Sequence, residues 1–117
     1  MKIGEVCLLT NDVIRLSNFY KVLLGVENHS DDNVHQFIIS EETSLTVYND
    51  GAARETNCNN ICIAFTVDDV DAEFERLKSF GVEITDTPAE RPWGAKNMMF
   101  KDPDGNQVVF RSFSSNL

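Results

Sequence analysis

Few side chains in this sequence could do chemistry, and the first of them is an isolated acid near the start. Glu5 precedes an apolar run, Val6-Cys7-Leu8-Leu9, that has the composition of a strand. If its carboxyl group points into a semi-enclosed cavity, desolvation should raise its pKa, and Glu5 could then act as a base or contact a cationic ligand. The alternative is a solvated carboxylate at the edge of a sheet, and the sequence leaves both open.

The three cysteines, Cys7, Cys58 and Cys62, are the next candidates. Because their number is odd, at least one thiol cannot pair within the chain, and free thiols in a reducing, cytoplasmic setting are the simpler expectation. Cys58 and Cys62 have no neighbouring Cys or His cluster, so we expect no structural zinc site. Since no histidine is locally placed to deprotonate Cys62, we interpret it as a small buried apolar residue in preference to a nucleophile.

Two further side chains could recognise a ligand directly. Trp93 follows a proline and precedes a glycine, an arrangement that can present a rigid indole for stacking on a flat or cationic group. Its alternative role is a structural plug on the loop. Arg111 lies two residues beyond Val109 on the last expected strand, so the two share a face, where Arg111 could bind an anion or pair with Glu5. A surface position is the alternative for Arg111.

The elements that must position these residues come in two similar units. In each, a short apolar strand leads through an acidic residue into a helix whose apolar residues lie three and four apart, and a glycine, Gly25 or Gly81, ends the helix. Further strands are predicted over 34–39, 44–48, 95–101 and 107–113, with a short strand at Val26 or Val82 that would complete βαβββ in each half. Asp102-Pro103-Asp104-Gly105-Asn106 predicts a hairpin turn between the last two strands.

Length and composition place these elements in one small domain. The 117 residues suffice for one domain with a packed core, and 42% hydrophobic with 25% charged residues is an ordinary globular composition. We expect an α+β domain over 1–117, with module one at about 1–50, a connector at about 51–59 and module two at about 60–117. A net charge of -9 should repel nucleic acid, and no apolar stretch approaches the length of a membrane span.

Five motifs, in order, resemble those of the glyoxalase/bleomycin-resistance/extradiol-dioxygenase superfamily, also called vicinal oxygen chelate. They are Asn18-Phe19-Tyr20, Leu23-Leu24-Gly25, Val67-Asp68-Asp69-Val70-Asp71, Arg91-Pro92-Trp93-Gly94 and Asp102-Pro103-Asp104-Gly105-Asn106. The resemblance covers essentially the whole chain. It implies two tandem βαβββ modules that form a curved mixed sheet around a central cavity. Members include lactoylglutathione lyases, epimerases, ring-cleaving dioxygenases and metal-free drug-sequestering proteins, so the fold alone does not choose a function.

The resemblance also implies where a catalytic metal would be held. In metal-dependent members the ligands come from the first strand of each half and from the last strand. Here the first-strand places fall on Glu5 and Cys62, and the last-strand place and its partner in the first half fall on Val109 and near Leu45 or Thr46, neither of which is a carboxylate. A divalent ion needs several charged or imidazole ligands that converge, and we therefore expect no metal and no other cofactor.

The leading hypothesis is a metal-independent small-molecule-binding protein that sequesters a cationic or aromatic compound. The alternative is a metal-dependent lyase or isomerase resembling lactoylglutathione lyase, or a dioxygenase-like enzyme; a third is a non-catalytic subunit. Members of the superfamily commonly pair two chains, which implies a homodimer. The side chains expected to bind the ligand are Glu5, Phe37, Tyr48, Cys62, Trp93, Met99, Val109 and Arg111.

Overall fold

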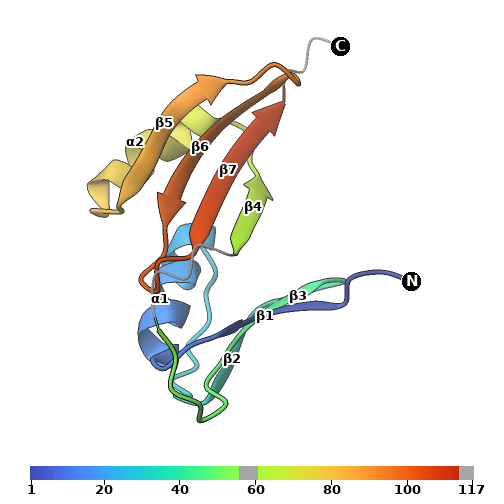
Figure 1. The fold of residues 1–117 in the computed structure, drawn as a ribbon, viewed down its shortest axis with the longest axis vertical. Coiled ribbons are helices and arrows are strands. Elements are labelled where there is room, and N and C mark those ends of the chain that lie inside the picture. Colours follow the sequence, from blue (N-terminus) through green and yellow to red (C-terminus); the bar gives the residue numbers. More distant parts are fainter. Residues whose placement is uncertain (56–60, 114–117) are drawn as a thin grey trace. The chain divides into compact units, whose positions relative to one another are not determined.

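A computed structural model describes residues 1–55 and 61–113 of the chain, which form helices and strands of the expected α+β class. The chain divides into two compact units, Met1–Glu55 and Thr56–Leu117, and each contains one helix and one sheet (Figure 1). Cys58 and the other residues of the expected connector from 56 to 59 lie outside the described residues.

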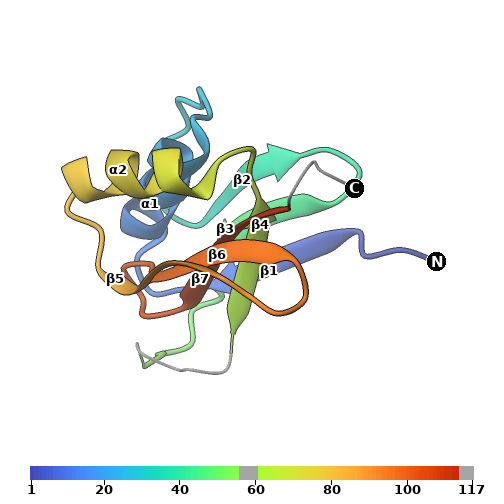
Figure 2. The ribbon, with the colours of Figure 1, turned by 90° about the horizontal axis from the view of Figure 1, so that it is seen from above.

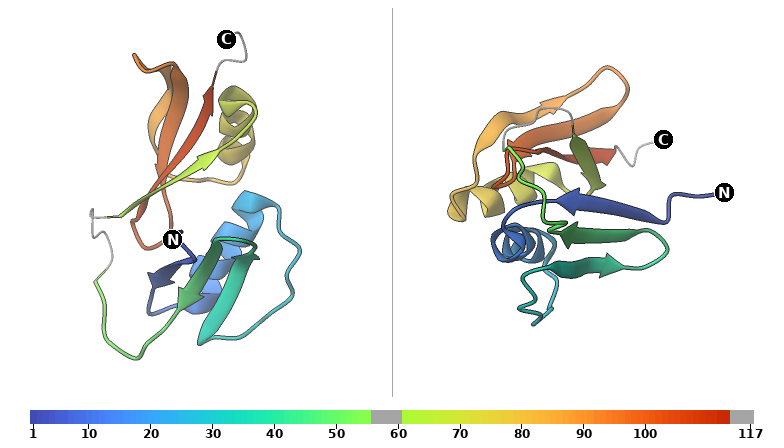
Figure 3. Two further views of the ribbon diagram at one scale, coloured as in Figure 1. Left: turned by 90° about the vertical axis from the view of Figure 1, so that its right-hand side faces the viewer. Right: turned by 60° about the horizontal axis from the view of Figure 1, so that its bottom comes forward.

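The first unit is a three-stranded sheet with one helix. Its elements, in chain order, are β1 (Glu5–Leu9), α1 (Val13–Leu24), β2 (His35–Ser40) and β3 (Ser44–Tyr48). The strand order is β1-β3-β2, with β1 parallel and β2 antiparallel to the central β3, as the views in Figure 3 let the reader follow. The side chain of Asp12 accepts a hydrogen bond from the Arg15 amide and so caps the start of α1.

The short strand expected at Val26 is absent, so the first unit is βαββ and the βαβββ expectation was wrong for this half. Hydrogen bonds from side chains, and not backbone pairing with a neighbouring strand, fix the segment after α1. Asn28 Nδ2 donates to the Phe37 carbonyl oxygen at 2.7 Å, and Lys21 Nζ donates to the Ser30 carbonyl oxygen at 3.0 Å. These bonds satisfy carbonyls locally, and the segment therefore follows the helix and β2 without pairing as a strand.

The second unit has the full βαβββ order. Its elements are β4 (Cys62–Thr66), α2 (Val70–Ser79), β5 (Ile84–Glu90), β6 (Ala95–Lys101) and β7 (Gln107–Phe113). The sheet order is β4-β7-β6-β5, in which β4 runs parallel to β7 and the other neighbours are antiparallel. The second strand of this half, β5, begins at Ile84, two residues later than the strand expected at Val82.

Each helix covers one face of its own sheet (Figure 2). Because strand residues alternate between faces, the side chains toward the helix are mostly apolar and mostly buried, and those on the other face are mixed. The buried apolar side chains of the first unit include Leu8, Leu16, Tyr20, Ile38 and Val47, and those of the second include Val70, Leu77, Met98, Phe100, Val108 and Phe110. The face of each sheet opposite the helix is here called its open face.

A buried aspartate organises the turn between β6 and β7, as the sequence motif predicted. Asp102 Oδ1 accepts hydrogen bonds from the Asp104 and Asn106 amides, at 2.9 and 3.0 Å, and its Oδ2 accepts one from Asn106 Nδ2 at 2.9 Å. Gly105 takes a positive φ of 83°, which a residue with a Cβ adopts at a cost. The hairpin that positions β7 therefore depends on one carboxylate.

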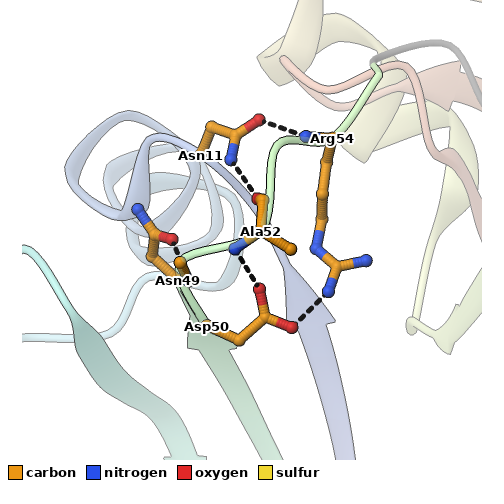
Figure 4. A network of polar contacts seen from close by, with 6 residues as sticks. Asn11, Asn49, Asp50, Ala52 and Arg54 are labelled. Carbon is orange, nitrogen blue, oxygen red and sulfur yellow. Dashed lines mark hydrogen bonds and ion pairs between the residues drawn. The ribbon is translucent and has the colours of Figure 1, made fainter.

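A second polar network fastens the chain after β3 to the start of α1 (Figure 4). Asn11 donates through Nδ2 to the Ala52 carbonyl oxygen and accepts from the Arg54 amide, both at 2.8 Å. Asp50 accepts from the Ala52 amide and pairs with the Arg54 guanidinium, and these two bonds hold the pKa of Asp50 below its usual value. The first unit thus includes residues up to about Arg54.

Replacing Gly25 with alanine should lower the free energy of unfolding by about 1 kcal/mol, because Gly25 ends α1 at a φ of 65° that disfavours a Cβ. A Cβ built there meets nothing within 4 Å, so the cost is conformational and not steric. Urea unfolding followed by circular dichroism measures it. Gly4, which has a negative φ and equally open space, provides the matched control. Equal effects of G4A and G25A would contradict the interpretation.

Candidate functional site

The open face of the first sheet carries three of the residues expected to bind a ligand. The register pairs Glu5 with Ser44, Cys7 with Thr46 and Leu9 with Tyr48, while Phe37 lies opposite Thr46 on the other side of β3. Since paired residues share a face, these side chains all lie opposite the buried Leu8 and Val47. Glu5, Phe37 and Tyr48 are thereby brought onto one surface.

Three rings form a continuous aromatic strip on this face. The His35 ring lies 4.8 Å from that of Phe37 and 5.3 Å from that of Tyr48, between ring centroids. Phe37 is 51% exposed and Tyr48 is 37% exposed, and Leu9 beside Tyr48 is 41% exposed. Large apolar side chains gathered on one exposed face are typical of a binding surface. His35 joins the two predicted aromatic residues on this face.

Glu5 lies on β1, which is an edge strand, and its side chain is exposed. Thr46 Oγ1 donates a hydrogen bond to Glu5 Oε2 at 3.1 Å, which directs the carboxylate along the open face toward the central strand. Of the two readings left open by the sequence, the edge-facing, solvent-exposed carboxylate matches this geometry. A carboxylate in that position places a negative charge at one end of the aromatic strip.

The open face of the second sheet carries four more of the expected residues, Cys62, Met99, Val109 and Arg111. Val109 lies between Ala64 on β4 and Met99 on β6, and Cys62 lies beside Gln107. Met98 and Phe100, on either side of Met99, are fully buried on the helix face, because neighbouring residues of a strand point to opposite faces. The apolar centre of this open face is therefore Ala64, Val109 and Met99.

A row of polar side chains crosses the same face next to this apolar centre. Arg111 Nε donates to Thr66 Oγ1 at 3.1 Å, and the Arg111 guanidinium carbon lies 5.2 Å from the centroid of the Phe113 ring. On the other side of β6, Arg91 donates to Asn97 Oδ1 at 2.7 Å and to Asp86 Oδ2 at 2.6 Å. Asn97 is the register partner of Arg111, so it connects the two arginines.

Two expectations for single residues need correction. Cys62 is exposed and is not the buried apolar residue expected, because it begins β4 at the edge of its sheet with its side chain on the open face. Trp93 is 68% exposed in the turn between β5 and β6, so it is not a structural plug. Cys7 and Cys62 are both free thiols, which confirms the expectation for the two cysteines that the structure describes.

The residues at the family's metal positions do not fit a divalent ion. Thr46 is the counterpart of Val109 in the first unit. Thr46 pairs with Cys7 on β1, and Val109 pairs with Ala64, which occupies the equivalent position on β4. A hydroxyl and an isopropyl group therefore occupy two of the four positions, and Glu5 and Cys62 occupy the other two. Within either unit, the described residues contain no group of three or more His, Cys, Asp or Glu placed to hold a metal.

Sequence reasoning missed several members of these surfaces. Leu9, Thr66, Asp86, Arg91 and Asn97 were not among the expected site residues, although Arg91 belongs to a motif that was noticed. The hairpin turn at 102–106 and the two flanking strands were predicted, and together they fix the register that places Asn97 opposite Arg111. The contact between Arg91 and Asn97 needed the three-dimensional turn between β5 and β6.

The motifs, the βαββ and βαβββ units and the parallel pairing of first and last strands define the class of this protein. The family model of the Glyoxalase/Bleomycin resistance protein/Dioxygenase superfamily matches residues 2–110, and the chain belongs to that superfamily. The resemblance inferred from the sequence is thus confirmed.

Individual relatives agree with this assignment. The chain is 30% identical to the uncharacterized protein YraH of Bacillus subtilis (strain 168), over 92% of this chain and 95% of YraH. A glyoxalase/bleomycin resistance protein/dioxygenase from Nocardioides superposes with a TM-score of 0.80 at 22% identity, covering 100% of this chain and 86% of that one. A lactoylglutathione lyase from Agrobacterium tumefaciens gives 0.74 at 20% identity, covering 95% and 92%. At these identities, the two structures establish the fold alone.

Neither α1 nor α2 has the length and apolar composition needed to cross a membrane, and no other helix occurs among the described residues.

Proposed function

We propose that this protein is a metal-independent small-molecule-binding protein of its superfamily, and that the open face of the first unit binds a flat cationic compound. The observation that supports the proposal is the exposed strip of His35, Phe37 and Tyr48 with the Glu5 carboxylate on the same face. The ligand in this proposal is a small aromatic or quaternary ammonium compound.

The aromatic part and the cationic part of such a ligand each have a complementary group on this surface. Phe37 and Tyr48 offer ring faces and edges, and a cation near an aromatic ring gains about 0.5–1 kcal/mol at an exposed site and more when desolvated. Glu5 supplies a full negative charge whose direction is set by the Thr46 hydroxyl. The net charge of -9 adds a long-range field that attracts cations and repels anions from the chain as a whole.

The alternative of metal-dependent catalysis receives no support from the donor set. Glu5 and Cys62 are the only ionisable groups at the family positions, and Thr46 and Val109 replace the remaining ligands. The similarity to the lactoylglutathione lyase concerns the fold, so it does not transfer that protein's activity. In our proposal, binding therefore requires no bound metal.

Replacing Glu5 with glutamine should weaken binding of benzyltrimethylammonium about threefold to fivefold, because an exposed ion pair contributes up to about 1 kcal/mol. NMR titration of the full-length protein measures the dissociation constant and reports amide shifts on β1, β2 and β3. E27Q removes a charge of the same sign from the segment after α1, outside the three strands, and should leave the affinity unchanged. Benzyl alcohol, a neutral aromatic probe, should bind E5Q and the unaltered protein equally.

Equal loss in E27Q and E5Q would reduce the effect to overall charge and contradict the proposed site. Metal content measured on the purified protein, together with a hemithioacetal isomerisation assay, tests the function itself. Stoichiometric tightly bound Ni²⁺ or Zn²⁺ with turnover would replace the proposal by a metal-dependent lyase.

A further inference from the structure

We propose that the second unit carries a separate site for a small organic carboxylate, in which Arg111 and Asn97 bind the carboxylate and the pocket beside Phe113 receives an apolar body. This inference goes beyond the proposed function, which concerns a cation on the first unit. It assigns a negatively charged ligand to the sheet of the second unit.

Arg111 is the group that would bind the anion. Its side chain is exposed on the open face, and its Nε is occupied by Thr66 Oγ1 while the Phe113 ring lies beneath the guanidinium. These two contacts fix the plane of the group. Among residues 1–55 and 61–113, no carboxylate pairs with Arg111, so its terminal nitrogens keep their donors for a ligand. A planar guanidinium held in this way suits the two oxygens of a carboxylate.

Asn97 supplies a second hydrogen-bond donor next to the Arg111 guanidinium. It lies directly across from Arg111 in the register between β6 and β7. Arg91 Nε donates to Asn97 Oδ1 at 2.7 Å, and this bond orients the amide so that Nδ2 is its remaining polar group. Arg91 itself is neutralised by Asp86 at 2.6 Å, so it acts as a positioning residue and Arg111 carries the uncompensated charge.

A shallow pocket of about 400 Å³ adjoins these donors. Gly94, Ala95 and Phe113 form part of its wall, and Ala95 and Phe113 are register partners one pair along the open face from Asn97 and Arg111. Lys96, another wall residue, is already paired with Asp71 at 2.5 Å, which raises its pKa. The pocket therefore offers apolar surface on the side of Arg111 where a ligand's body would extend.

The charges around the pocket favour a singly charged anion. Glu90 lies in the pocket wall and repels negative charge, whereas Asp86 and Arg91 neutralise each other. The chain's net charge of -9 does the same at longer range. A dianionic phosphate would meet this repulsion with both of its charges and would have one uncompensated arginine to offset it. A monocarboxylate needs only that arginine, and its apolar body gains contact with Phe113.

Benzoate is the probe that tests the site, with benzamide as its neutral counterpart. Titration of benzoate into the full-length protein should give saturable amide shifts centred on Ala95, Asn97, Arg111 and Phe113. R111Q should lower the affinity for benzoate about tenfold. R111K should lower it nearly as much, because lysine lacks the paired N–H donors of a planar guanidinium. N97A should weaken it about threefold. R76Q removes an arginine from α2 that is paired with Glu73, and it should bind benzoate like the unaltered protein.

Undiminished benzoate binding by R111Q, or shifts centred on the first unit, would overturn the assignment, as would benzamide binding equal to that of benzoate. Circular dichroism of each variant shows that it is folded. The two proposals fail separately: E5Q should leave benzoate binding intact, and R111Q should leave benzyltrimethylammonium binding intact. Loss of both ligands in either variant would contradict separate sites.

Discussion

Replacing Phe110 with alanine should destabilise the second unit by about 3–5 kcal/mol, which is the range for truncating a buried phenylalanine. Phe110 is 1% exposed and makes edge-to-face contacts with Phe100, at 5.1 Å between centroids, and with Phe65, at 6.1 Å. The cavity left by truncation would be lined by two rings that cannot collapse into it easily, since Phe100 is fully buried as well.

Urea unfolding followed by tryptophan fluorescence measures this loss, because the single tryptophan, Trp93, lies in the second unit. F113A is the matched control on the same strand: Phe113 lies on the open face and is 49% exposed, so its truncation should cost less than about 1 kcal/mol. Similar costs for F110A and F113A would contradict the assignment of β7 faces, on which the proposed carboxylate site of the second unit depends.

Replacing Asp102 with alanine should lower the free energy of unfolding by about 2–3 kcal/mol. The change removes three hydrogen bonds to a carboxylate, and bonds to charged groups contribute about 1.5–3 kcal/mol. Asp102 is 5% exposed, so the Asp104 and Asn106 amides would lose their acceptor in a region that water reaches poorly. The turn would then hold β7 less firmly against β6, and benzoate affinity should fall along with stability.

The D102N variant separates the loss of the hydrogen-bond acceptor from the loss of the negative charge. Asparagine keeps Oδ1 for the two backbone amides but presents an Nδ2 donor to the Nδ2 donor of the Asn106 side chain, so its cost should be smaller than that of D102A and still measurable. Denaturant unfolding of both variants gives the comparison. A D102A protein as stable as the unaltered chain would show that Gly105 and the proline suffice to form the turn.

Local pattern was enough to place most elements. The strands predicted over 44–48, 95–101 and 107–113 coincide with β3, β6 and β7, because alternating apolar residues between turn residues describe a half-buried strand. Asp12 and Asp69 cap the two helices as their positions suggested. The missing strand at Val26 shows the limit of such patterns, since the bonds made by Asn28 and Lys21 involve partners nine residues away.

The sequence by itself determined the superfamily, the repeated units and the parity that puts Val109 and Arg111 on one face, because these follow from motifs and from alternation along a single strand. Tertiary structure alone decided which strands are neighbours. Parallel pairing brings Thr46 next to Cys7 and Thr66 next to Arg111, and the β5–β6 turn brings Arg91 to Asn97. Such contacts depend on the order of strands in a sheet, which residues close together in the chain do not encode.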